Sequence, residues 1–254
     1  YDNELSSVRV TLYVFCKSCD VYLIKRRLYL VENTEQNISS GSGATWVEYE
    51  DIPTYLRDAF IAIEDKRFWD HNGVDWITTA QAAIVFFVPI GNDRGGSTLT
   101  QQLVKNLTGD KDYSIQRKIQ EIFRAINLEK ELGDKTEIIE QYCNIVYFAQ
   151  GADGIQEAAQ VYFSKDAKDL TLIECAAMAA IVQNPSYWDP LVYPEHNASR
   201  RNLILKQMLS QGLITQAEFD EAYLKELVLD TSYIKESSGG TTSWYTDAVI
   251  EECI

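Results

Sequence analysis

The sequence predicts a mainly α-helical domain that carries a small β-rich annex at its N-terminus. Across residues 44–213, apolar side chains recur at helical spacing, and capping residues, glycine and proline bound these stretches. Residues 1–43 are instead dense in β-branched and aromatic residues and end in a Ser/Gly-rich linker. Apolar residues make up 46% of the 254-residue chain, which excludes a disordered protein.

The first expected helix begins near Pro53, a residue suited to a first helical position, and its apolar residues follow at i, i+4 spacing up to Ile63. A second begins at Thr98, because Thr98 and Gln101 form a T-x-x-Q capping box. The third should place one stripe of isoleucines on a single face: Ile115, Ile119, Ile122 and Ile126.

Residues 170–182 are apolar nearly all round, which predicts a central buried helix that ends before Asn184-Pro185. Cys143 and Cys175 lie among apolar helical neighbours and are expected in the core. Cys16 and Cys19 form the only CxxC, which leaves a local disulfide, two free thiols or a redox pair open.

Net charge and hydropathy exclude several classes of protein. A formal net charge of −15 argues against a general nucleic-acid binder, since phosphate contacts need a basic surface. The longest apolar run, residues 82–90, is shorter than the roughly 20 residues that a bilayer-spanning helix needs. The chain starts without a signal-peptide pattern or an initiator Met, so we expect a fragment of a longer protein.

Glu64 and Asp65 form the first candidate site. They close the first expected helix just before two aromatic residues and the turn at Gly73. Partial shielding of a carboxylate by aromatic neighbours suits a general base. The alternative is an ordinary charged helix end in solvent.

The second candidate is the start of the helix at Thr98. Two glycines precede it, and Lys105 lies two turns along the same face. A helix N-terminus offers backbone N–H groups and a positive dipole end, which favours a bound phosphate. The spacing is not that of a Walker loop, and an ordinary capped helix with a solvated lysine is the alternative.

The third candidate is Arg117, Lys118 and Glu121, which share the helix face opposite the isoleucine stripe at i, i+3 and i, i+4 spacing. The surrounding stretch from Arg94 to Arg124 is net basic within an acidic chain, which favours a bound anion. An exposed ion pair is the alternative. Two glutamates on either side of a basic helix together indicate carboxylate-driven sugar chemistry on a phosphate-bearing donor.

At these residues the chain resembles the peptidoglycan glycosyltransferase (family 51) domain of class A penicillin-binding proteins. Five ordered motifs carry the resemblance, which covers about residues 44–225. They are Glu64-Asp65-x-x-Phe68-x-x-His71-x-Gly73, Gly95-Gly96-Ser97-Thr98-x-Thr100-Gln101-Gln102, Arg117-Lys118-x-x-Glu121, residues 135–144 and residues 200–205. The fourth motif departs from the usual pattern, because Cys143 stands where the family has leucine.

The resemblance implies a lysozyme-like bilobal fold that polymerises lipid II into β-1,4-linked glycan with inversion and release of undecaprenyl diphosphate. It implies Glu64 as the general base and Glu121 as the second catalytic residue, beside the donor diphosphate. Arg200 and Arg201 are expected to be structural, and residues 76–92 to form a jaw that touches lipid. The implied substrate-binding residues are Asp65, Phe68, His71, Ser97, Thr98, Gln102, Lys105, Asn106, Arg117 and Lys118.

The resemblance also allows a divalent metal, Mg or Mn, at Glu121, and implies no organic cofactor. The expected partners are lipid II, the growing glycan strand, the membrane surface and cell-wall synthesis proteins, with no nucleic acid. We expect the protein to lie at the extracytoplasmic face of the cell membrane. We also expect residues 226–254 to form an acidic tail that leads to a transpeptidase domain. A lysozyme-like peptidoglycan hydrolase and a non-catalytic cell-wall scaffold remain as alternatives.

Overall fold

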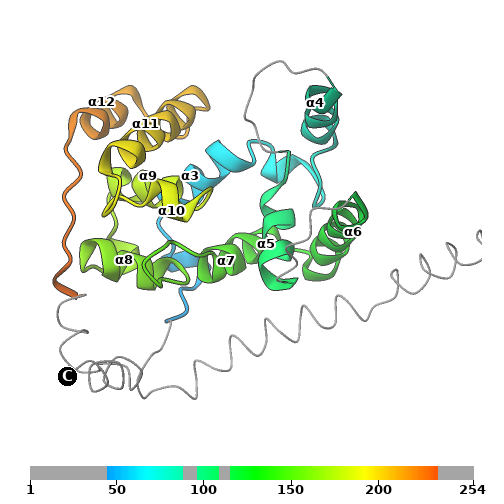
Figure 1. The fold of residues 1–254 in the computed structure, drawn as a ribbon, viewed down its shortest axis with the longest axis horizontal. Helices are drawn as coiled ribbons and strands as arrows, with labels where there is room; N and C mark the ends of the chain where they lie inside the picture. The colour runs from blue at the N-terminus through cyan, green and yellow to red at the C-terminus, as the bar shows by residue number, and fades with distance from the viewer. Residues whose placement is uncertain (1–44, 88–95, 109–114, 234–254) are drawn as a thin grey trace, which may run out of the picture.

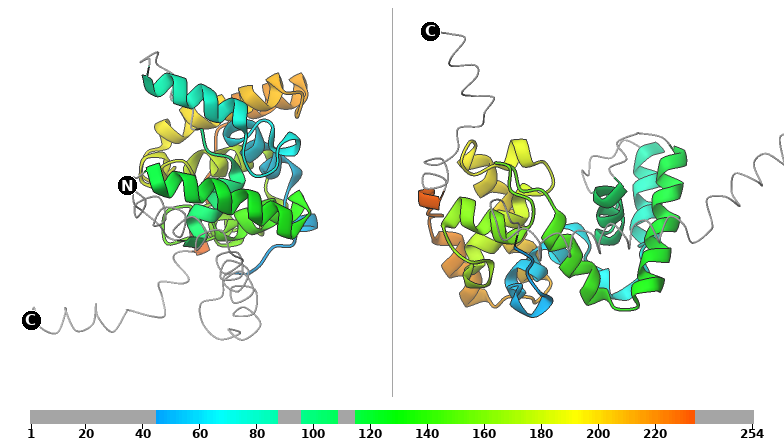
Figure 2. Two further views of the ribbon diagram at one scale, coloured as in Figure 1. Left: turned by 90° about the vertical axis from the view of Figure 1, so that its right-hand side faces the viewer. Right: turned by 90° about the horizontal axis from the view of Figure 1, so that it is seen from below.

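The structure is a computed structural model, and it describes residues 45–87, 96–108 and 115–233. These residues form a helical protein whose helices gather in two groups (Figures 1 and 2). One group holds α3, α8 and α9 to α12, and the other holds α4, α5 and α6, with α7 running from one to the other (Figure 1). The expectation of a bilobal, mainly α-helical fold is confirmed for this part of the chain.

The α-helices include the four expected from capping and spacing, which are α3, α5, α6 and α9. Their bounds are α3 (Thr54–Glu64), α4 (Trp76–Phe87), α5 (Leu99–Thr108), α6 (Ile115–Leu132), α7 (Lys135–Ile145), α8 (Ile155–Phe163), α9 (Leu172–Ile181), α10 (Pro185–Trp188), α11 (Pro194–Ser210) and α12 (Gln216–Leu224). Three single 3₁₀ turns complete the set: Tyr49–Asp51, Phe68–Asp70 and Ala167–Asp169.

Helix α9 is the centre of the first group. All of its residues are buried, as the uninterrupted apolar sequence predicts, and it packs against α3 and α11. A capping box between Thr171 and Glu174 fixes its start. Both Cys143 and Cys175 lie fully buried, and burial raises the pKa of each thiol, so they are inert core residues.

The predicted starts of two helices can be compared with the structure directly. At α5 the backbone N–H of Thr98 donates to Gln101 Oε1 (2.9 Å) and that of Gln101 donates to Thr98 Oγ1 (3.2 Å), which confirms the predicted capping box. Pro53 precedes α3 as its N-cap instead of occupying the first helical position, so the helix begins one residue later than predicted.

The isoleucine stripe of α6 is only partly a core face, which corrects the prediction. Ile122 and Ile126 pack against the core, but Ile119 is 48% exposed, and Phe123 on the next turn is also exposed. Glu121, predicted on the opposite face, is instead buried. The apolar periodicity identified the helix but not its buried face. That face also includes Glu121, which is paired with Arg117 and Lys118.

Several expectations concern residues outside the described part of the chain. The β-rich annex at residues 1–43, Cys16, Cys19 and most of the tail at residues 226–254 lie there. Residues 226–233 run alongside α8, where the N–H of Asp230 donates to the carbonyl of Tyr162 (2.9 Å). Among the described helices, none has the length and apolar character to span a bilayer.

Candidate active site

A cavity of about 1,230 Å³ opens between the two groups of helices. Its lining draws residues from α3, α5, α6 and α11, which are distant in sequence. Glu64 and Glu121, the two predicted catalytic residues, both line it. The other predicted residues in the lining are Asp65, Ser97, Thr98, Gln102, Lys105, Asn106 and Arg117.

Glu64 is the last residue of α3, and both of its carboxylate oxygens are engaged. Arg200 of α11 donates from Nη2 to Oε1 (3.1 Å), and Gln102 of α5 donates from Nε2 to Oε2 (2.9 Å). The hydroxyl of Tyr142 in turn donates to Gln102 Oε1 (3.2 Å), so the amide is held in one orientation. The carboxylate is therefore fixed at the cavity wall while its side chain stays 15% exposed.

Arg200 corrects the sequence prediction, which treated it as structural. Its side chain is 10% exposed, lines the cavity and pairs with Glu64. Burial lowers the pKa of its guanidinium, and the nearby Glu64 carboxylate opposes that shift. Arg201, its neighbour, is buried beside Asn202 and does not line the cavity.

Glu121 lies in a different electrostatic setting on α6. Arg117 Nη1 donates to Glu121 Oε2 (2.8 Å), and Lys118 Nζ contacts Oε1. Lys118 also donates to Ser97 Oγ (2.7 Å), which ties α6 to the segment before α5. The Glu121 side chain is only 6% exposed, so this is a buried, charge-rich cluster and the exposed ion-pair alternative is wrong.

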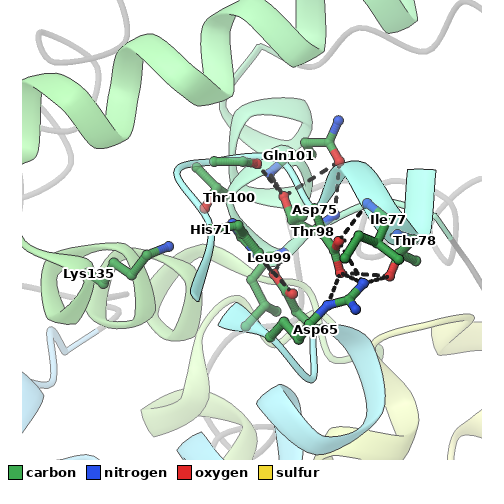
Figure 3. Close-up of polar contacts among 12 residues, drawn as sticks. Asp65, His71, Asp75, Ile77, Thr78, Thr98, Leu99, Thr100, Gln101 and Lys135 are labelled. Carbon is green, nitrogen blue, oxygen red and sulfur yellow. Dashed lines mark hydrogen bonds and ion pairs between the residues drawn. The ribbon is translucent and has the colours of Figure 1, made fainter. Parts of the chain in front are cut away.

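The start of α5 differs from the predicted phosphate site. The N–H of Leu99 donates to Asp65 Oδ2 (3.0 Å), and His71 Nε2 lies 3.0 Å from both oxygens of Asp65 (Figure 3). With the capping box on Thr98 and Gln101, these contacts already supply an anion to the helix N-terminus. A substrate phosphate would have to be bound by Lys105 and Arg117 instead.

Phe68 and His71 were expected to bind substrate, and the structure corrects this. Phe68 is fully buried, and neither residue lines the cavity. Phe68 meets the His71 ring edge-on at 6.2 Å, and Lys135 Nζ lies 4.4 Å from the centroid of Phe68. His71 contacts the Asp65 carboxylate, and Phe68 packs on His71, so both residues affect the cavity only through Asp65.

Asp75 is a residue that the sequence reasoning did not select. Its carboxylate accepts the N–H groups of Ile77 and Thr78 at the start of α4 (Figure 3). Arg67 also binds it, with Nη2 donating to Oδ2 (2.7 Å). Burial alone would raise the pKa of Asp75, but the hydrogen bonds from Thr78 and Arg67 outweigh it and lower the pKa to about 2. An acid directly before a helical run is the capping signal that could have found it.

The residues at Glu121 do not fit the divalent metal that the resemblance allows. Both carboxylate oxygens already face cations, Arg117 and Lys118. Within the described residues no three metal-ligating side chains come together. Hard cations such as Mg²⁺ need several oxygen ligands, and the two oxygens of Glu121 are already bound by Arg117 and Lys118.

Comparisons with known proteins agree with these observations. Residues 32–209 match the Transglycosylase family. The chain is 37% identical to Penicillin-binding protein 1A of Aquifex aeolicus over 92% of its own length, and 41% identical to Penicillin-binding protein 1F of Bacillus subtilis over 81%. It spans only 30% and 28% of those two relatives.

A solved structure, Penicillin-Binding Protein 1A from Haemophilus influenzae, matches with a TM-score of 0.44 and 22% identity, over 77% of this chain and 20% of that one. The family match covers more than half of the chain and includes helices of both groups. The chain therefore belongs to the transglycosylase family, and its resemblance to the glycosyltransferase domain of class A penicillin-binding proteins is confirmed.

Proposed function

We propose that this chain is a peptidoglycan glycosyltransferase that joins lipid II units into β-1,4-linked glycan. The observation that carries the proposal is that Glu64 and the cation-bound Glu121 face one cavity from different helices. The first carboxylate has access to a substrate proton. The second organises positive charge where a leaving diphosphate needs it.

In this reaction Glu64 is the general base. It accepts the proton of the acceptor 4-hydroxyl as that oxygen attacks the donor C1, and the bond from C1 to the diphosphate oxygen breaks with inversion. Arg200 holds the carboxylate in one orientation, since its guanidinium donates to Oε1 (3.1 Å). Gln102 positions the other oxygen.

The leaving group is undecaprenyl diphosphate, and its charge needs cations. Arg117 and Lys105 line the cavity, and Lys118 lies behind them on Ser97 and Glu121. Glu121 holds the Arg117 and Lys118 side chains in place, so their positions are fixed before substrate arrives. Ser97, Thr98 and Asn106 complete this side of the cavity.

Two alternatives are less well supported. A lysozyme-like hydrolase uses carboxylates and water, and it has no diphosphate for the Arg117 and Lys118 cluster to bind. A scaffold that only binds glycan has no need for a carboxylate held by both Arg200 and Gln102 at a cavity wall.

The proposed setting is the extracytoplasmic face of the cell membrane. Trp76 and Ile77 on α4, with Ile119 and Phe123 on α6, are large apolar side chains left exposed in the second group of helices. Such a surface suits contact with a membrane whose lipid carries the substrate. In the full-length protein we propose a transpeptidase domain and cell-wall synthesis partners, because the relatives that share this region are much longer penicillin-binding proteins.

The test is a glycan-strand assay with the purified 254-residue chain and lipid II. Polymerase activity gives a ladder of strands with release of the diphosphate lipid. A hydrolase shortens preformed strands, and a scaffold changes neither substrate. A chain that hydrolyses strands, or one that binds lipid II without turnover, would contradict the proposal.

A further inference from the structure

An exposed group of aromatic rings lies beside the cavity, and the proposed chemistry does not use it. We define the aromatic platform as Tyr187, Trp188, Tyr193 and His196. Its rings come from α10 and the first turn of α11, which pack together beside α9 (Figure 1). Tyr187 is 46% exposed and Tyr193 is 45% exposed.

The four rings contact one another. The His196 ring stacks on Tyr187 with centroids 4.3 Å apart and on Tyr193 with centroids 5.1 Å apart. Trp188 meets Tyr187 edge-on at 4.7 Å. Pairs of aromatic rings at these separations attract one another, so the rings form one continuous apolar surface.

The platform is rigidly mounted. Asn197 donates from Nδ2 to the carbonyls of Trp188 (2.8 Å) and Ala177 (3.0 Å), which pins the end of α10 to α9. Asp189 is buried, accepts the N–H of Leu191 (2.9 Å) and receives Gln150 Nε2. Proline opens both α10 and α11 and fixes the backbone there. A surface held in this way loses little conformational entropy when it binds a ligand.

The platform is continuous with the cavity. The ring centroid of Trp188 lies 5.5 Å from the guanidinium carbon of Arg200, the residue that binds Glu64. Pro185, at the start of α10, is itself in the cavity lining. A ligand that extends past Glu64 along α10 therefore meets the platform.

The charged residues around the platform indicate which kind of ligand it can bind. Residues 184–199 contain no lysine or arginine, and the guanidinium of Arg200, the next residue, is already paired with Glu64. A diphosphate or an anionic lipid surface needs cations, so neither suits the platform. The faces of pyranose rings are uncharged and rich in C–H groups, which pack favourably on the negative face of an aromatic ring.

We infer that the aromatic platform binds the sugar backbone of a glycan strand as it passes out of the cavity. The inference rests on the proposed function, because it takes the strand as the ligand of the cavity. Pyranose rings stack on Tyr187 and Tyr193, and the tyrosine hydroxyls donate to sugar oxygens. The platform thus holds strands between successive additions.

The test measures binding of a hexamer of β-1,4-linked N-acetylglucosamine by calorimetry to the 254-residue chain. The double variant Tyr187→Ala/Tyr193→Ala is expected to bind the hexamer about tenfold more weakly, since two stacking contacts are lost. Tyr187→Phe/Tyr193→Phe keeps the rings and should bind within about threefold of the parent, since only hydroxyl contacts are lost. Tyr233→Ala, which truncates another exposed tyrosine, is the matched control and should bind like the parent.

Product lengths give a second readout that separates this inference from the proposed function. The double alanine variant, assayed below its own melting temperature, should make shorter strands from lipid II. Strands of parental length with parental hexamer affinity would overturn the platform while leaving the glycosyltransferase intact. Hexamer binding that depends on the platform, in a chain that never polymerises lipid II, would overturn the proposed function alone.

The same variants test two other ligands for the aromatic platform, a lipid surface and a second copy of this chain. If the double alanine variant loses binding to phosphatidylglycerol vesicles and keeps its affinity for the hexamer, the platform is a lipid contact and the inference is wrong. If the parent is a dimer by sedimentation and the variant a monomer, with equal hexamer affinity, the platform is a self-association surface and the inference is equally wrong.

Discussion

The two walls of the cavity hold their carboxylates in opposite ways. Glu64, on the α3 wall, is bound by one cation, Arg200, and by a neutral amide, and it is 15% exposed. Glu121, on the α6 wall, is bound by two cations and is 6% exposed. A base needs contact with substrate, whereas a carboxylate surrounded by cations is suited to positioning charge. The difference supports the proposal that Glu64, and not Glu121, takes part in proton transfer.

The largest expected effect comes from removing the charge of Glu64. Glu64→Gln keeps the size of the side chain, and its amide oxygen can still accept a hydrogen bond from Gln102 or from Arg200. The amide cannot act as a base, however. Turnover of lipid II should fall by about 10²–10⁴ while lipid II binding stays largely in place. Turnover is followed by release of the diphosphate lipid. Parental turnover in this variant would refute the assignment of the base.

The second effect tests the opposite wall. Glu121→Gln leaves Arg117 and Lys118 close together without their shared carboxylate, so both the cluster and donor binding should weaken. We expect a loss of roughly 1–3 kcal/mol in the free energy of unfolding and a fall of roughly 10- to 100-fold in kcat/KM, equivalent to about 1.4–2.8 kcal/mol. Denaturant titration and initial rates measure the two quantities.

Glu121→Gln also sharpens the comparison with Glu64. If Glu121 were the base, its glutamine variant would lose kcat as completely as Glu64→Gln does, with little change in stability. Exposed Lys130, near the far end of α6, provides the control, since Lys130→Ala should leave both quantities unchanged.

The third effect concerns Asp75, which holds the start of α4 against Arg67 where the two walls meet. Its pKa in the folded protein, about 2, is below its ordinary value, so its contribution to stability is present above about pH 4 and is lost as the pH falls toward 2. Because Arg67 is 37% exposed, solvent screens the pair and the contribution is about 1–2 kcal/mol. Asp75→Asn should flatten this part of the pH profile of denaturant unfolding. A variant profile as steep as the parental one would contradict the assignment.

The smallest expected effect is at Lys105, an exposed cation that lines the cavity. Lys105→Ala should raise KM for lipid II by about three- to tenfold and change kcat little, since one solvent-exposed charge contact is lost. Initial rates at limiting and saturating lipid II separate the two parameters. A parental KM would show that Lys105 is only a solvated side chain.

Local sequence signals determined much of the helical framework. The capping box at Thr98, the apolar run of α9 and the helical spacing of Arg117, Lys118 and Glu121 each depend on residues within one or two turns of one another. The five motifs also indicated the family, and the resemblance predicted nine of the residues that line the cavity.

Only the tertiary structure decided how those segments use their side chains. Asp65 comes from beyond α3 and occupies the N-terminus of α5, which no local pattern predicts. Arg200 reaches Glu64 across 136 residues of sequence, and Phe68 turns inward to the core instead of to the substrate. Hydrogen bonds between helices depend on which helices pack together, and packing is set by the whole core, so pairs within one helix could be predicted from sequence while partners on different helices could not.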